Sequence, residues 1–226
     1  QLKDISITMF PASCRKILGF ALPSSLSMIL MPLSSGVLTA LISRYGNEAV
    51  AAVSAAGRVE MFAFIVPMAL GMSLVPFVSQ NFGAGHMDRI YQARGYSIRF
   101  ALIYGALITA VIFFAAPMLA RLFTEEQQVM ELFTLYLRIV SVGFGMMEVH
   151  RYCGFFLTGI HHPVLSTLLN VFRVLVLLLP LSFIGSSLSG IRGIFTGRLI
   201  SDLVAGSVGI LTVSWMLKQR IKLQPQ

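Results

Sequence analysis

The chain has 226 residues, of which 56% are hydrophobic and 12% are charged, and its mean hydropathy is +0.82. Soluble domains carry about 25% charged residues, so this composition leaves too little polar surface for a globule in water and excludes an ordinary cytosolic enzyme. The formal charge is +8. In a membrane protein such an excess indicates basic cytoplasmic loops, and no nucleic-acid partner is expected.

Apolar stretches follow one another along the whole chain, and each is long enough for a membrane-spanning helix, which needs roughly 20 apolar residues. They cover approximately 16–43, 48–81, 96–120, 131–160, 163–184 and 190–217. Unbroken runs favour helices over barrel strands, which alternate every second residue. We therefore expect an all-α polytopic membrane protein, a bundle of six transmembrane helices that forms one domain over residues 1–226.

Helix-ending and helix-starting residues separate these stretches. Gly46 is expected to end the first helix, and Asn47 is the expected N-cap of the second. Asp88 is a plausible N-cap for an amphipathic lead-in to the third helix. Residues 124–126 place acids at the start of the fourth helix, and residues 161–163 (His-His-Pro) separate the fourth from the fifth.

Basic residues near the ends of the spans predict the orientation, because Lys and Arg stay in the cytoplasm. Those on one side are Lys3, Arg15, Lys16, Arg89, Arg94, Arg99, Lys218, Arg220 and Lys222, and those on the other are Arg44, Arg121 and Arg192. The imbalance places both termini in the cytoplasm and agrees with an even number of spans. The expected location is the plasma (inner) membrane.

Processing and metal-binding signals are weak. The chain opens with Gln1, and its first residues include Lys3 and Asp4 rather than the apolar core of a signal peptide, so we expect a piece of a longer protein. Cys14 and Cys153 form no CxxC pair and no even framework. Neither a disulfide scaffold nor a metal site is expected.

The second stretch is too long for a straight span. About 34 residues at 1.5 Å each reach about 50 Å, against a hydrocarbon core of about 30 Å. Pro67, Gly71 and Pro76 can supply a bend, because proline removes an intrahelical hydrogen bond. Broken helices line cavities in transporters, and a structural kink in a packed bundle is an equally good interpretation of any single proline.

Four charged residues fall near the midpoints of the expected spans: Glu60, Glu148, Arg173 and Asp202. Each costs about 2.5–3.5 kcal/mol when it is unpaired at the bilayer centre, so each needs a partner or a function.

Local spacing suggests structural pairs for some of these charges. Arg198 and Asp202 are four residues apart on one helical face and can pair, as can Glu148 and Arg151, which are three apart. Arg173 could take an acid of either pair.

Glu60 has no such local cation, because Arg58, two positions away, points elsewhere. It needs a partner from another helix, a proton or a bound cation, and we interpret it as a candidate for coupling. His150, close to Glu148, could join a proton relay or be an ordinary hydrogen-bonded histidine.

The segment from Gly71 to Gly85 reads GMSLVPFVSQNFGAG, and an Asp-Arg pair follows at 88–89. Together they strongly resemble the repeated signature of the multidrug and toxic compound extrusion (MATE) family. Further matching segments follow in order, at residues 51–60 (AAVSAAGRVE), 136–139 (YLRI), 173–180 and 190–195. The resemblance covers nearly all of the chain, which looks like the second of two six-helix lobes.

The resemblance implies a secondary active transporter that uses a Na+ or H+ gradient to export organic, usually cationic, drugs or metabolites by antiport, and not an enzyme. Its partners would be the bilayer, a small organic substrate and the missing N-terminal lobe, with no cofactor beyond the coupling ion. In the family, acids on the first, second and fourth helices of this lobe take part in coupling or substrate binding. Glu60 and Glu148 match the second and fourth, whereas no acid occurs between Arg15 and Glu48.

The residues predicted for cation coupling or substrate binding are Glu60, Glu148, Arg151, Arg173 and Asp202. Two alternatives remain open at this point. One is a lipid-linked oligosaccharide flippase of the same superfamily, which would share the helices and kinks. The other, more remote, is a membrane-embedded enzyme, which would need a polar constellation at an interface rather than charges at the midplane.

Overall fold

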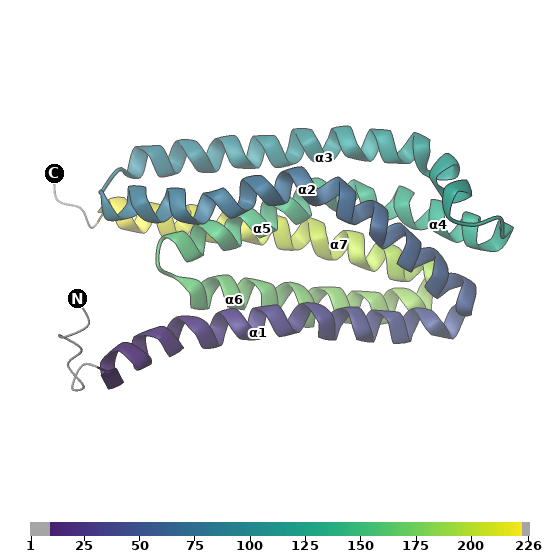
Figure 1. The fold of residues 1–226 in the computed structure, drawn as a ribbon, viewed down its shortest axis with the longest axis horizontal. Coiled ribbons are helices and arrows are strands. Elements are labelled where there is room, and N and C mark those ends of the chain that lie inside the picture. Colours follow the sequence, from purple (N-terminus) through teal and green to yellow (C-terminus); the bar gives the residue numbers. More distant parts are fainter. Residues whose placement is uncertain (1–9, 223–226) are drawn as a thin grey trace, which may run out of the picture.

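The computed structural model describes residues 10–222, and within that range the chain forms helices joined by short turns, with no strand (Figure 1). The helices are α1 (Phe10–Ile42), α2 (Asn47–Gly83), α3 (Met87–Phe123), α4 (Gln127–Val140), α5 (Phe144–Gly159), α6 (Pro163–Val171) and α7 (Leu179–Lys222). Three shorter segments continue them: the 3-10 turns η2 (Ser43–Tyr45) and η3 (Ser141–Gly143), and the π-helical segment η4 (Phe172–Leu178). Lys3 and the side chains of Arg15, Lys16, Arg220 and Lys222, which the charge count used, lie outside the described part, as does the side chain of Cys14.

The described residues form five helical stretches that are long and apolar enough to cross a membrane. The last, Pro163–Gln219, has 57 residues and contains a break at Ser189 and Gly190, where Gly190 adopts a φ of +60°. On either side of this break Gly185 and Gly193 approach so closely that a Cβ on either would overlap the backbone of the other. The chain therefore reverses here and crosses twice, which confirms the predicted all-α bundle of six passes.

Two layers of helices leave an opening between them. α1 packs along α6 and also contacts α7, whereas it has few contacts with α2, its neighbour in sequence. α2, α5 and the part of α7 that follows Gly190 form the second layer, and α3 covers the far side of α2 and α5 (Figure 1). Side chains of both layers line this opening: Met31 and Leu38 come from α1, Glu60 from α2 and Met147 from α5.

Two of the predicted N-caps are wrong. The amphipathic lead-in to the third helix is confirmed, because α3 is continuous from Met87 into the apolar part that starts near residue 96. The predicted cap is wrong: His86 is the N-cap, and Asp88 lies in the first turn. α2 already begins at Asn47, so Asn47 is not the cap. Gly46 takes that position with a φ of +103°, a conformation that glycine adopts without strain.

Two of the prolines inside the helices free a backbone carbonyl that a side chain from another helix then satisfies. Pro67 cannot donate to the carbonyl of Ala63, and the hydroxyl of Tyr104 donates to that oxygen instead, at 2.9 Å. Pro117 likewise frees the carbonyl of Phe113, which accepts from Arg138 Nε at 3.2 Å. Both carbonyl oxygens that these prolines free therefore have a hydrogen-bond donor.

Candidate functional site

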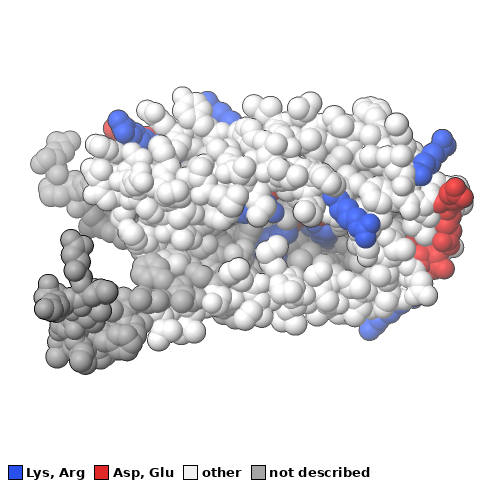
Figure 2. All heavy atoms as spheres, in the orientation of Figure 1, with Lys and Arg blue, Asp and Glu red and all other residues white. Residues whose placement is uncertain are grey.

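A cavity of about 370 Å³ opens between the two layers, and we call it the central cleft. Figure 2 shows basic side chains inside a hollow of an otherwise mostly uncharged face. The charged and tyrosine side chains of the cleft are Glu60, Tyr136, Arg173 and Arg198, and its apolar lining includes Met31, Leu38, Met147, Leu178 and Phe195. The cleft thus combines apolar walls with a few fixed charges, as small-molecule sites do.

Glu60 on α2 lies at the centre of a three-residue cluster that joins three helices. Its Oε2 lies 2.7 Å from Nη2 of Arg198 on α7, and its Oε1 accepts from the hydroxyl of Tyr136 on α4 at 2.6 Å. Arg198 Nη1 also donates to the Tyr136 hydroxyl. The carboxylate that lacks a local cation therefore takes its partner from another helix, one of the options that the sequence left open.

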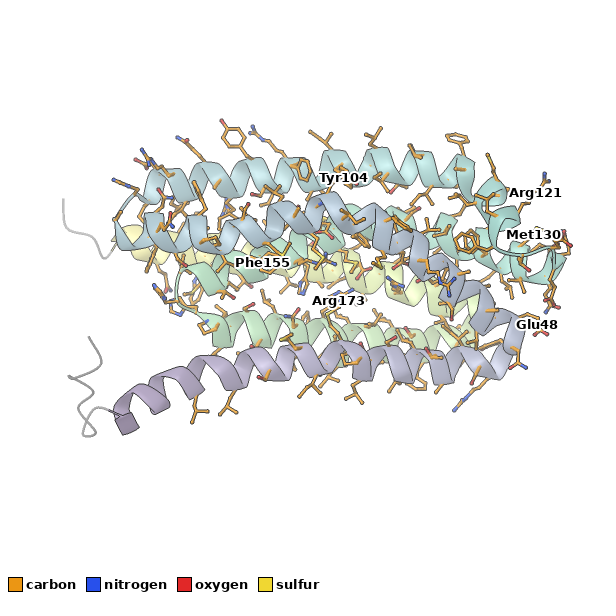
Figure 3. All side chains as sticks on the ribbon, viewed as in Figure 1. Glu48, Tyr104, Arg121, Met130, Phe155 and Arg173 are labelled. Carbon is orange, nitrogen blue, oxygen red and sulfur yellow. The ribbon has the colours of Figure 1, made fainter. Side chains whose placement is uncertain are left out.

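A second ion pair lies deeper. Arg173, which the π-helical segment η4 carries, donates from Nη2 and Nε to Oδ1 of Asp202 at 2.6 and 3.0 Å. The Asp202 side chain is fully buried, and its other oxygen, Oδ2, has no hydrogen-bond partner among the described residues. Figure 3 shows Arg173 in the space between the two layers.

The predicted local pair of Arg198 with Asp202 is therefore wrong. The two residues have the right spacing along α7, but each finds a partner on another helix that the spacing rule cannot take into account. Arg173 takes Asp202, so Arg198 is available for Glu60.

The predicted pair of Glu148 and Arg151 is confirmed, with Oε1 of Glu148 3.0 Å from Nη1 of Arg151. The contact lacks hydrogen-bond geometry, and neither buried oxygen of Glu148 has a hydrogen-bond partner in the range 10–222. The guanidinium of Arg151 also lies over the ring of Phe64, 5.3 Å from its centre.

His150 is held by two hydrogen bonds rather than by the neighbouring acid. Its Nε2 lies 3.1 Å from Oδ1 of Asn170, and its Nδ1 lies 3.3 Å from the carbonyl oxygen of Ala205. The structure favours the structural interpretation of this histidine.

A second cavity, of about 190 Å³, lies one helical turn from the central cleft between α5 and α6. Met147 and Arg173 line the cleft. The second cavity is lined by residues one turn away along the same helical stretches: His150 and Arg151 after Met147, and Asn170 before Arg173. The structure thus brings Glu60 and Arg173 into one cleft and Arg151 into the next cavity. It places Glu148 and Asp202 behind these arginines as buried counter-charges.

Sequence reasoning missed two residues of the cleft. Arg198 was assigned to a local pair, and Tyr136 was not considered for the site. The only available signal for Tyr136 was its place in the segment YLRI, one of the segments that carry the family resemblance. No group of three or more His, Cys, Asp or Glu side chains suited to a metal ion occurs within residues 10–222.

A family model described as MatE matches residues 23–184 of the chain, which is most of its length. The chain belongs to the MatE family. The match confirms the resemblance that the signature segments indicated. Members of this family are membrane transporters.

Among the curated relatives, a FAD transporter of Shewanella oneidensis is 33% identical over 195 residues, which are 86% of this chain and 43% of that protein. The multidrug export protein MepA of Staphylococcus aureus is 26% identical over 212 residues, which are 91% of this chain and 45% of that protein. The chain thus spans less than half the length of these relatives.

Solved structures show the same fold. The crystal structure of the Vibrio cholerae MATE transporter VcmN in its bent form aligns with a TM-score of 0.90 at 29% identity, over 97% of this chain and 49% of that one. The six-pass bundle therefore corresponds to about half of a MATE transporter.

Proposed function

We propose that this chain is one lobe of a secondary active transporter that exports an organic compound by antiport against Na+ or H+ across the plasma membrane. Both termini of the lobe would lie in the cytoplasm, and a second lobe would complete the walls of the central cleft. The family supports transport, and the ion pair of Glu60 and Arg198 in the cleft supports the coupling step.

The coupling step follows from the cluster that Glu60 forms. Its carboxylate joins α2 to α7 through Arg198 and to α4 through Tyr136. A proton or a cation arriving at Glu60 neutralises this carboxylate and weakens both contacts, which frees Arg198. Loading of the coupling ion would thus be linked to the separation of α2 from α7 and to the charge that the cleft presents to a substrate.

The exposure of the charges is the observation that bears on the substrate. The side chains of Arg198 and Arg151 are 20% and 24% exposed, whereas those of Asp202 and Glu148 are 0% and 2% exposed. Glu60, whose side chain is 11% exposed, also lines the cleft but is paired with Arg198. The guanidinium groups are therefore the more exposed charges of the two cavities, and Asp202 and Glu148 lie behind them. Guanidinium groups bind phosphate and carboxylate in a bidentate manner, so we propose a substrate with such an anionic group. The relative named as a FAD transporter agrees with this proposal.

A cationic drug is the second candidate substrate, and it is the one that the sequence first suggested. The apolar lining of the cleft, which includes Met31, Met147 and Phe195, suits a flat apolar cation. The relatives named MepA are multidrug export proteins, which favours the same candidate.

The test uses the full-length transporter that contains this chain, reconstituted in proteoliposomes with an imposed Na+ or H+ gradient. The probes are FAD, a fluorescent dye cation and a lipid-linked sugar. We expect gradient-driven movement of FAD, and a loss of it in Arg151→Gln but not in the control Arg44→Gln, since Arg44 lies outside both cavities.

Each alternative has its own outcome. Movement of the dye alone would overturn the anionic substrate, and movement of the lipid-linked sugar alone would favour the flippase. Export of any probe at the same rate without either gradient would contradict antiport.

A further inference from the structure

A larger cavity, of about 620 Å³, lies outside the central cleft and shares no lining residue with it. It opens where α3 ends, α4 begins and α7 reverses, and we call it the end cavity. Figure 3 shows Arg121 and Met130 at this end of the bundle. Its lining residues are Pro117, Arg121, Gln127, Gln128, Met130, Glu131, Leu132, Thr134, Leu135, Arg138, Ile191 and Arg192.

Arginines from three parts of the chain converge on the end cavity. Arg121 comes from the last turn of α3, Arg138 from α4 and Arg192 from the start of the final pass. None of the three forms an ion pair with a described residue. The lining contains one acid, Glu131, whose Oε1 already accepts from Gln127 at 2.7 Å. The lining therefore carries more positive than negative charge.

Arg138 lies in the last turn of α4, and α5 continues the same candidate span, Gln127–Gly159, beyond it. Eleven residues separate it from the start of the helix at Gln127, which is about 16 Å along the axis. Its contacts are with Phe113, through the backbone carbonyl and through the ring, whose centre lies 5.0 Å from the guanidinium carbon. Neither contact neutralises its charge. An exposed guanidinium at this depth is costly unless an anion reaches it or the side chain extends to the interface.

The lining also has an apolar part, beside the polar side chains of Gln127, Gln128 and Thr134. Pro117, Met130, Leu132, Leu135 and Ile191 line the same cavity as the three arginines. A ligand that fills this space needs an anionic group for the arginines and a hydrocarbon part for these side chains. A membrane phospholipid has both, and the helices around the cavity are long and apolar enough to cross the bilayer that contains it.

We propose that the end cavity binds a phospholipid, whose phosphate contacts Arg121, Arg138 and Arg192 and whose acyl chain lies along the apolar lining. Glu125 and Glu126, in the turn before α4, do not line the cavity. The site is independent of substrate transport in the central cleft.

The test measures lipid retained by the full-length transporter with native mass spectrometry, after its release from nanodiscs. The probes are phosphatidylglycerol and a galactolipid with the same acyl chains and no phosphate. We expect the wild type to retain phosphatidylglycerol preferentially. The triple variant Arg121→Gln/Arg138→Gln/Arg192→Gln is expected to bind it about tenfold more weakly.

Arg44→Gln is the matched control, because Arg44 is exposed outside the cavity lining. We expect it to bind like the wild type. If the triple variant fails to fold, the double variant Arg121→Gln/Arg192→Gln replaces it, since both side chains are exposed and form no described ion pair.

Equal retention of phosphatidylglycerol by the variants and the wild type would overturn the proposal. Equal retention of the galactolipid would show that the arginines do not recognise phosphate, which also overturns it. Displacement of the lipid by millimolar inorganic phosphate would indicate a site for a soluble anion instead of a lipid.

Discussion

Glu60→Gln separates the two roles of Glu60, which are packing and charge. Glutamine keeps the size of the side chain and can still bond to Tyr136 and Arg198, but it leaves the guanidinium of Arg198 without its counter-charge. An unpaired arginine at the centre of a span costs about 2.5–3.5 kcal/mol. Because the Arg198 side chain is 20% exposed to the cleft, we expect a loss of about 2 kcal/mol of stability.

Arg198→Gln and the double variant Glu60→Gln/Arg198→Gln complete the comparison. Removal of both charges leaves no unpaired charge, so we expect the double variant to lose about 1–2 kcal/mol less stability than the sum of the losses of the two single variants. The assay is thermal unfolding of the full-length transporter in detergent, followed by gradient-driven export in proteoliposomes at matched protein amounts. Coupled export is expected to be lost in Glu60→Gln and to stay lost in the double variant, because neither retains a carboxyl to load. Moving one elementary charge across the membrane potential supplies about 2.3 kcal/mol per 100 mV, and a site without a carboxyl cannot use this energy.

Two results would refute this reasoning. Strict additivity of the two stability losses would mean that Glu60 and Arg198 do not interact. Wild-type coupled export by Glu60→Gln would mean that Glu60 does not carry the coupling ion, and Glu148 would become the next candidate.

Three further predictions concern the fold and the missing lobe. Asp202→Asn leaves Arg173 without its buried counter-charge, so we expect a loss of about 3 kcal/mol, seen as a lower folded yield in fluorescence-detected gel filtration. Gly105→Ala would place a methyl group against the backbone of Gly145 and force α3 away from α5, whereas the methyl group of the control Gly95→Ala would meet open space. We expect a lower Tm for Gly105→Ala alone, and equal Tm values of the two variants would contradict this prediction. The chain expressed alone is expected to insert with both ends in the cytoplasm but not to export substrate. Reporter fusions at the two ends and a dye-efflux assay measure this, and an external end or robust efflux would show it to be wrong.

The sequence was sufficient to predict the helices but not the residues that cap them. The six apolar stretches correspond to the six passes, because burial in lipid requires long uninterrupted apolar segments. The polar start of the third helix was predicted from its amphipathic pattern, but the cap was misplaced by two residues, at Asp88 instead of His86.

The candidate site shows the same limit for contacts. The pair of Glu148 and Arg151 was predictable because both residues lie on one helical face. The partner of Glu60 was not predictable, because Arg198 is 138 residues away in the sequence. Asp202 is nearer to Arg198 along the chain and had the spacing of a local pair. The roles of Glu60, Glu148, Arg151, Arg173 and Asp202 in coupling or binding stay predictions until the variants are measured.

The turn at Ser189 and Gly190 also bears on how the protein is made. Only these two residues leave helical geometry between the fifth and sixth passes, so there is almost no loop to carry across the membrane. The nearest charged residue to the turn is Arg192, and Gly185 and Gly193 already hold the two passes together. During synthesis the two passes would therefore enter the bilayer together as a helical hairpin. The fifth pass would then reach its final position in the membrane only after the ribosome has synthesised the sixth.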